Sequence, residues 1–181
     1  MTAAAHGGFA VLAYAGGDPD PYTIRLFKFD WQGELLWTSE ISESSAYVYA
    51  VKETADSGFI CLQNGVAATK TDRCGRIEWQ TSVPSGGICH SGDIAQTAEG
   101  DYVLASSQEG MWRICHLSSS GQLLSDTTVA VLGPDSTSSY PCAVTSTADG
   151  GILIAGGSSF AFHLVKYSSL DPLTQVFDSC Y

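Results

Sequence analysis

Four side chains in two short stretches have the chemistry of a binding site. His90 follows Cys89 and precedes Asp93 by three residues. An imidazole near a carboxylate can hold a metal ion or transfer a proton. Their spacing is not that of a metal-ligand motif, so a polar loop at the entry to a strand is the alternative interpretation.

Asp18 and Asp20 form the second candidate. They lie in the glycine- and proline-rich stretch 16–22, and two carboxylates two residues apart can bind a hard cation such as calcium. The stretch lacks the further oxygen ligands and the glycine spacing of a known calcium motif, so an exposed acidic loop is the alternative. Calcium is therefore the only cofactor that the sequence suggests, and we predict no catalytic residue.

Composition excludes several classes of partner. The 181 residues contain 19 acidic and 8 basic side chains, which give a net charge of -11. Such a surface repels phosphate, so we expect no nucleic-acid partner. Apolar runs are interrupted every few residues, well short of the roughly 20 that span a bilayer, so we expect no membrane insertion. The acidic balance and the serine-rich loops favour an extracellular or cell-surface location.

A recurring turn phrase indicates the strands that must position these residues. The phrase occurs three times, and a fourth time in degenerate form. It begins at Thr54, Thr97 and Thr147, and the worn copy begins at Ala4. A second phrase, Asp-x-x-Gly or a variant, follows each copy and places Gly33, Gly75 and Gly121 at one backbone position. A period of roughly 42 to 50 residues with two turns per period is typical of four-stranded blades.

The sequence thus predicts an all-β fold, a β-propeller of four-stranded antiparallel blades in a single domain or propeller segment. The repeats cover approximately residues 1–43, 44–84, 85–132 and 133–181. The first repeat opens at a turn, so we expect it to lack its innermost strand. An open blade edge exposes unpaired backbone, which favours a homo-oligomer or a place within a longer propeller.

The second phrase also predicts how neighbouring blades dock. Trp37 and Trp79 follow Asp30 and Asp72 by seven residues, and their indoles should pack across the gap to the next blade. Period-two alternation places Leu35 and Ile77 on the same face as these tryptophans. Equal spacing puts Ser125 and Gln175 at the tryptophan position in the third and fourth repeats. His116 shares its repeat position with Lys28, Lys70 and Lys166, which indicates a side chain facing solvent.

The cysteines form no C-x-x-C pair, so neither a zinc site nor a redox motif is indicated. Cys61 falls at an apolar inner-strand position and should be buried. Cys74 falls in an exposed turn. Cys89 and Cys142 come near the start of the innermost strands of neighbouring repeats, and a Cys89–Cys142 disulfide is the one bridge that we predict.

The paired phrases resemble the propeller repeats of secreted and surface proteins, best seen in Thr147-Ala148-Asp149-Gly150-Gly151-Ile152-Leu153 and Leu164-Val165-Lys166. The Asp-x-x-Gly-x-x-x-Trp half, carried by Asp30, Gly33, Trp37 and Asp72, Gly75, Trp79, is similar to the tryptophan-docking motif of quinoprotein-type propellers. The quinoproteins need adjacent cysteines that this chain lacks. The resemblance implies a fold and a general binding role rather than an activity.

Three functions fit this sequence. The leading hypothesis is a non-catalytic binding or scaffold module whose loops bind a protein or a glycan and which can self-assemble. The first alternative is a cofactor- or metal-dependent propeller enzyme with a site at the axial end, near Cys89, His90, Asp93 and Cys142. The second alternative is a structural subunit of a filament or coat.

Overall fold

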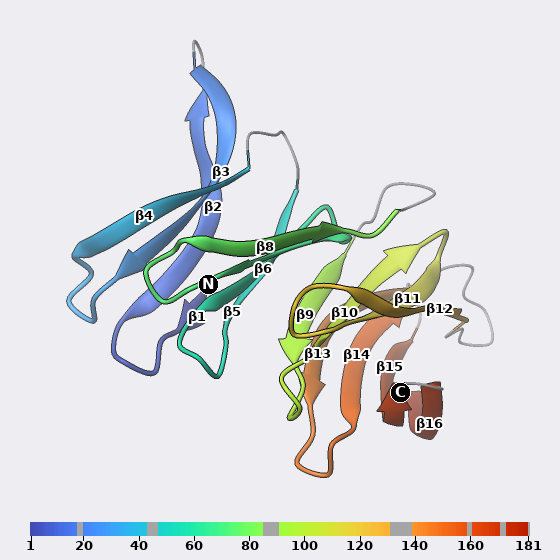
Figure 1. Ribbon diagram of the computed structural model, residues 1–181. Helices are drawn as coiled ribbons and strands as arrows, with labels where there is room; N and C mark the ends of the chain where they lie inside the picture. Colours follow the sequence, from blue (N-terminus) through green and yellow to red (C-terminus); the bar gives the residue numbers. More distant parts are fainter. Residues whose placement is uncertain are drawn as a thin grey trace. The chain divides into compact units, whose positions relative to one another are not determined.

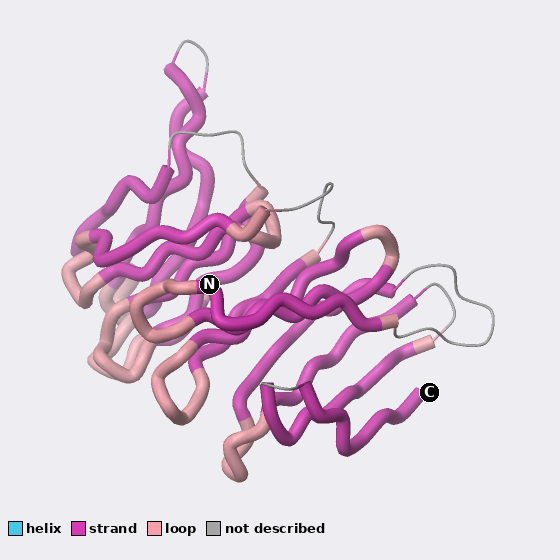
Figure 2. Tube along the Cα trace, turned by 45° about the vertical axis from the view of Figure 1, so that its right-hand side comes forward, coloured by secondary structure: helices cyan, strands magenta, loops and turns pink. Residues whose placement is uncertain are grey.

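The computed structural model describes residues 1–17, 20–42, 47–84, 91–130, 139–158, 161–170 and 173–180. Within these ranges, residues 17, 20, 21, 139, 169 and 173–180 are described by their backbone alone. Strands joined by short turns make up almost all of the described chain (Figure 2). None of the described segments is a helix that could cross a membrane.

The strands form four antiparallel sheets of four strands each, and every sheet follows the order of the chain (Figure 1). The all-β prediction is therefore confirmed, and each sheet lies within one of the predicted repeats. The first sheet contains β1 (Thr2–Ala3), β2 (Phe9–Gly17), β3 (Asp20–Phe29) and β4 (Leu35–Ser42), and the second contains β5 (Val48–Glu53), β6 (Phe59–Gln63), β7 (Ala67–Thr71) and β8 (Ile77–Ser82). The third contains β9 (Gly92–Gln96), β10 (Tyr102–Gln108), β11 (Met111–Leu117) and β12 (Leu123–Val129), and the fourth contains β13 (Ser139–Ser146), β14 (Ile152–Ser158), β15 (Phe162–Leu170) and β16 (Leu173–Cys180).

The first sheet has an innermost strand, contrary to the prediction. Thr2 pairs with Ala10 and Ala3 pairs with Phe9, so two residues suffice to form β1. The turn that follows has the same hydrogen bonds as the other copies, with the Ala4 amide donating to the Gly8 carbonyl at 3.0 Å. A strand of two residues carries no alternation pattern, which is why the sequence did not reveal it.

The chain divides into two compact units, residues 1–82 and 83–181, and each unit contains two sheets with an apolar core between them. The core of the first unit is built by Ala10, Leu12, Ile24, Leu26, Ile41, Val51, Phe59 and Cys61. The core of the second unit is built by Val103, Ala105, Trp112, Ile114, Val144, Ile152, Ile154, Val165 and Tyr167. Period-two alternation directs one face of each sheet into these cores.

In β4, β8 and β12 the pairing register shifts directly after the first paired residue, and in β16 it shifts further along the strand. Phe29 pairs with Leu35 while Lys28 pairs with Trp37, so Leu36 is an extra residue. The same step occurs between Ile77 and Trp79 in β8. A bulge reverses the alternation of the strand. Alternation predicted that Leu35 and Ile77 share a face with the tryptophans, but this prediction is wrong because the bulge places them on the opposite face. They are 53% and 42% exposed.

The bulge also corrects the alignment of the fourth repeat. Lys166 pairs with Phe177 and Tyr167 pairs with Gln175. Phe177 therefore holds the register position of Trp37, and Gln175 holds that of Leu35. The paired residues Tyr167 and Gln175 are eight positions apart in the chain, whereas Phe29 and Leu35 are six apart, so the strand is displaced by two residues, which the equal-spacing prediction did not allow for. Asp171, which the fourth repeat has in place of the turn glycine, and Pro172 lie outside the described residues.

Candidate functional site

The structure gives only a partial account of the residues predicted to bind. Asp18, Cys89 and His90 lie outside the described residues, so the calcium loop, the histidine site and the Cys89–Cys142 bridge stay predictions. Asp20 pairs with Gly17 at the start of β3, and its side chain is not described. Cys142 is exposed, and its Sγ lies 3.6 Å from the Tyr140 carbonyl oxygen.

Asp93 has a contact that connects two sheets. Its side chain is buried, and Oδ2 accepts a hydrogen bond from the Val144 amide of β13 at 3.0 Å. The pairing of β13 with β14 shifts between Pro141 and Ala143, immediately before this amide. A carboxylate that accepts a buried backbone N–H is a strong structural contact. Asp93 thus joins the inner strands of the third and fourth sheets.

The Asp-x-x-Gly turns have the geometry that the sequence predicted. Asp30 Oδ1 accepts from the Glu34 amide at 2.8 Å, and Asp72 Oδ1 accepts from the Arg76 amide at 2.9 Å. Gly33, Gly75 and Gly121 all have positive φ, between 79° and 90°. In the third repeat the Ser118 hydroxyl replaces the carboxylate and accepts from the Gln122 amide at 3.0 Å. Short oxygen acceptors at this position close the turn.

Trp37 packs across to the next sheet, as the sequence predicted. A methyl group built on Gly75 would lie 2.7 Å from Cζ3 of Trp37, so the indole rests directly on this glycine. The indole also meets the Phe59 ring edge-on at 5.9 Å. Ser39 Oγ donates to the Gly75 carbonyl at 2.5 Å. The glycine of one turn therefore serves both as a left-handed turn residue and as the surface on which the tryptophan of the preceding sheet packs.

A buried lysine connects the first turn of the second repeat to the outermost strand, β8. The Lys70 side chain is 3% exposed, and its Nζ donates to Asp56 Oδ2 and Glu78 Oε2 at 2.8 Å each. The same nitrogen donates to the Thr71 carbonyl at 2.9 Å. Lysine has three N–H donors, and all three find acceptors here. We call this arrangement, a lysine reaching the turn between the first two strands of its sheet, the lysine latch.

The latch recurs with changes of partner. Lys166 donates to Asp149, which is equivalent to Asp56. In the third repeat His116 Nε2 lies 3.2 Å from Asp101 Oδ2. His116 was predicted to face solvent because it shares its position with three lysines; its side chain is only 14% exposed, so this prediction is wrong. Cationic residue types indicated exposure, but the latch buries them.

The latch changes the ionisation of its carboxylates. Partial burial by itself raises the pKa of Asp56, but hydrogen bonds from Lys70, Thr54 and the Gly58 amide outweigh it and lower this pKa to about 2. Hydrogen bonds from Lys166 and Thr147 lower the pKa of Asp149 to about 2. A bidentate contact from Arg113, at 2.8 and 2.5 Å, likewise lowers the pKa of Asp126. These carboxylates are therefore ionised structural groups at neutral pH.

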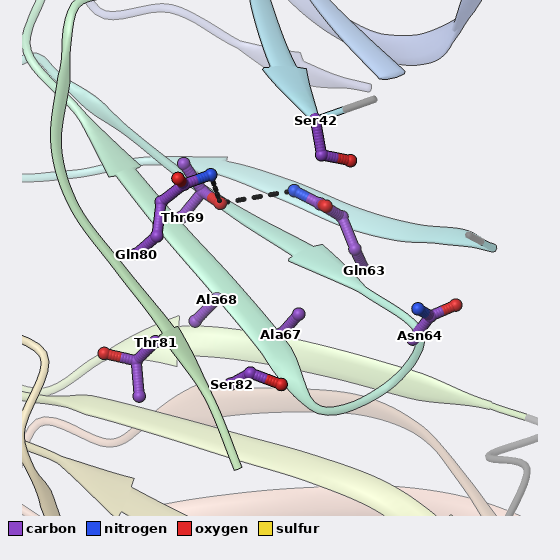
Figure 3. A pocket seen from close by; sticks show the side chains of 9 residues that line it. All are labelled: Ser42, Gln63, Asn64, Ala67, Ala68, Thr69, Gln80, Thr81 and Ser82. Atoms are coloured by element: carbon purple, nitrogen blue, oxygen red, sulfur yellow. Dashed lines mark hydrogen bonds between the residues drawn. The ribbon is translucent and has the colours of Figure 1, made fainter. Parts of the chain in front are cut away.

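The second sheet carries a pocket of about 340 Å³ that sequence reasoning missed. We call it the polar pocket, and Figure 3 shows the side chains that line it: Ser42, Gln63, Asn64, Ala67, Ala68, Thr69, Gln80, Thr81 and Ser82. None of these nine is ionisable. Its residues come from β4, β6, β7, β8 and the turn at Asn64, so no single stretch of sequence contains its pattern.

Two glutamines organise the polar pocket around one hydroxyl. Thr69 Oγ1 accepts from Gln63 Nε2 at 3.3 Å and from Gln80 Nε2 at 3.2 Å (Figure 3). Gln80 Nε2 also donates to the Ile41 carbonyl of β4 at 2.9 Å. Ser42 Oγ is buried without a hydrogen-bond partner among the described residues. The pocket thus offers pre-positioned amide groups and one unsatisfied hydroxyl.

Two of the thiols behave as the sequence predicted. Cys61 is fully buried, and burial raises the pKa of its thiol to about 12. Cys74 is exposed in its turn. Among the described residues no group of three or more His, Cys, Asp or Glu side chains is placed to hold a metal ion.

Comparison with known proteins identifies the fold. No protein-family model matches the sequence, and no curated protein does. Among solved structures, the WD40 domain of Neurospora crassa Pan2 matches with a TM-score of 0.64 at 13% identity, over 97% of this chain and 51% of that chain. The Dos1 propeller matches with a TM-score of 0.54 at 13% identity, over 98% of this chain and 48% of that chain.

An enzyme is also among the similar structures. Dihydro-heme d1 dehydrogenase NirN matches with a TM-score of 0.59 at 12% identity, over 94% of this chain and 34% of that chain. The chain spans about half the length of the Pan2 and Dos1 chains and about a third of the NirN chain. The predicted β-propeller fold is therefore confirmed, with four sheets as its blades. Identities this low establish the fold alone.

Proposed function

We propose that this chain is a non-catalytic β-propeller binding module, exported or displayed on a cell surface, that binds a protein or a glycan. The polar pocket is the observation that carries this proposal. The described residues that line it offer amide and hydroxyl groups, and none of them is ionisable. Such groups hydrogen-bond a ligand but do not exchange protons with it near neutral pH, which favours binding over acid-base catalysis.

A glycan is the partner that suits the polar pocket best. Sugar hydroxyls both donate and accept, as do the amides of Gln63 and Gln80. Asn64 Oδ1 accepts from the Tyr47 amide at 2.9 Å, which holds an aromatic residue beside a pocket residue. Tyr47 is 63% exposed. Its ring offers an apolar face with a polar tip, the combination that is enriched at binding surfaces.

Binding of labelled protein to a panel of neutral oligosaccharides tests this proposal. We expect a subset to bind, and Gln80→Leu to weaken binding about tenfold, because it removes an amide and leaves polar ligand groups unpaired. Gln122→Leu is the matched control, an exposed glutamine in a turn of the third blade, and should bind like the wild type. Binding of no sugar by folded protein, or equal binding by Gln80→Leu, would count against a glycan site.

Self-assembly is the second part of the proposal. Trp31 and Leu35, at the outer edge of the first blade, are 76% and 53% exposed, and large apolar side chains in such a place favour contact between copies. Light scattering over a range of concentrations should give a mass above that of one chain. We expect Leu35→Lys to reduce this mass, and a single chain at all concentrations would contradict self-assembly.

A further inference from the structure

Lys28, the latch lysine of the first blade, lacks the carboxylates that its counterparts have. Its Nζ donates to the Gly7 carbonyl at 2.7 Å and to the Phe29 carbonyl at 2.9 Å. The residue is 8% exposed, and none of the described carboxylates forms an ion pair with it. A buried ammonium without an opposite charge is unfavourable. Its third N–H is therefore available to an anion.

The two acids of the second-blade latch are replaced in the first blade. The turns at Ala4 and Thr54 have matching backbone hydrogen bonds, which makes His6 equivalent to Asp56. The matching bulges in β4 and β8 make Leu36 equivalent to Glu78. The first blade thus keeps the cation of the latch and loses both of its carboxylates.

A pocket of about 270 Å³ lies where those carboxylates would be. We call it the Lys28 pocket, and its lining includes His6, Lys28, Leu36, Trp37, Glu53 and Arg73. Trp37 and Leu36 provide apolar walls. Glu53 is the single carboxylate among the described lining residues, and its Oε2 accepts from the Ala5 amide at 2.6 Å. Two permanent cations therefore face one engaged carboxylate, in a chain whose net charge is -11.

The corresponding pocket of the second unit has the opposite character. It has about 260 Å³ and is lined by the latch residue His116 together with Glu99 and Asp101. Asp101 Oδ2 lies 3.2 Å from His116 Nε2, so the latch there is closed by an acid of its own chain. The two units can therefore be compared. The latch residue of the third blade, His116, has Asp101 as its acidic partner, whereas Lys28 has no such partner among the described residues.

We infer that the Lys28 pocket binds a small organic carboxylate with an apolar or aromatic body. The carboxylate takes the place that Asp56 occupies beside Lys70, where the two atoms lie 2.8 Å apart. Arg73 adds a second cation at the rim, and the body of the ligand packs against Trp37 and Leu36. Charge-assisted hydrogen bonds supply the specificity for an anion, and the apolar walls select against inorganic ions. This site is separate from the polar pocket and does not depend on a glycan binding there.

Calorimetric titration of the full chain with benzoate tests the inference. We expect benzoate to bind, and benzamide and inorganic phosphate to bind at least tenfold more weakly. His6→Asp should abolish benzoate binding and raise Tm. It introduces a carboxylate at the position equivalent to Asp56, where it can pair with Lys28 and fill the proposed anion site. Lys28→Met should abolish binding, and its melting curve shows whether it folds.

Lys166→Met is the matched control, because it removes the latch lysine of a blade that already has its acid. It should leave benzoate binding unchanged. Three results would overturn the inference: no binding of benzoate by folded wild type, equal binding of benzamide or phosphate, or unaltered benzoate binding by His6→Asp.

Discussion

At the scale of single residues, several charged side chains of this protein hold turns. Lys70 is buried yet fully hydrogen-bonded, because Asp56, Glu78 and a backbone carbonyl surround its ammonium. A buried charge is tolerable only with such partners. Removing one partner leaves the other charge uncompensated, so each latch should contribute measurably to stability.

Asp56→Asn tests the latch through its dependence on pH. The Asp56 pKa of about 2 in the folded chain lies below the roughly 3.9 of an unfolded aspartate. Its contribution is therefore present above about pH 4 and is lost as the pH falls towards 2. Because the side chain is 55% exposed, we expect a loss of only about 1 kcal/mol at pH 7. Urea unfolding should show the two proteins converging near pH 2.

The exposed pair Arg25–Glu40 supplies the control for this measurement. Arg25 Nη2 lies 3.3 Å from Glu40 Oε2, and the two side chains are 41% and 43% exposed. Glu40→Gln should change the free energy of unfolding by less than about 0.5 kcal/mol, because exposed ion pairs contribute little. A larger loss from Glu40→Gln than from Asp56→Asn would refute the role given to the latch.

At the scale of strands and turns, the docking of one blade on the next depends on a tryptophan and a glycine. Gly75 and Gly33 are equivalent turn residues, with φ of 79° and 90°. Only Gly75 lies under an indole, since a methyl group on Gly33 would meet nothing within 4 Å. Substitutions at these two glycines therefore separate the effect of positive φ from the effect of packing against Trp37.

Gly75→Ala should therefore destabilise the protein more than Gly33→Ala. Both substitutions place an alanine at positive φ, at about 1 to 2 kcal/mol each. Gly75→Ala adds a clash with Trp37, which we expect to cost a further 1 to 3 kcal/mol, roughly. Thermal unfolding of the two variants measures the difference, and the Trp37→Ala background should remove most of it, leaving the contact with Ser39 Cβ at 3.0 Å. If the difference persists there undiminished, the indole is not its cause.

Asp93 makes the second contact between elements that can be tested. Asp93→Ala leaves the buried Val144 amide without its acceptor, which should cost about 1 to 3 kcal/mol. Asp93→Asn keeps a carbonyl oxygen at the same place and should cost less. Equal losses from the two variants in denaturant unfolding would show that the hydrogen bond to Val144 is not what Asp93 contributes.

At the scale of the whole molecule, the net charge of -11 opposes the compact state. Added salt screens repulsion among exposed carboxylates more than it weakens the buried latches. We therefore expect Tm at pH 7 to rise as sodium chloride increases from low to about 0.5 M, by about 2 to 4 °C per kcal/mol of repulsion removed. The rise should shrink near pH 4.5, where many carboxylates are protonated. A fall in Tm with salt at pH 7 would mean that ion pairs outweigh the repulsion.

The sequence by itself determined the features that are local along the chain. Asp30, Asp72 and the glycines that follow them close their turns with hydrogen bonds inside five residues, so spacing alone predicted them. Four such repeats predicted four sheets, and the tryptophan position predicted the packing of Trp37 on the next sheet. These predictions succeed because each depends on a short segment with one favourable geometry.

Only the tertiary structure decided the features that join distant residues. Burial of Lys28 and Lys70, the acceptor role of Asp93, the polar pocket and the Lys28 pocket arise where separate strands meet. The residue types alone indicated exposed lysines and a binding role for Asp93 instead. A two-residue strand and a bulge were also missed, because neither leaves a periodic pattern. Whether a charged side chain is exposed or buried depends on the partners that the fold brings close to it. Those partners are distant in the sequence, so the order of the residues does not reveal them.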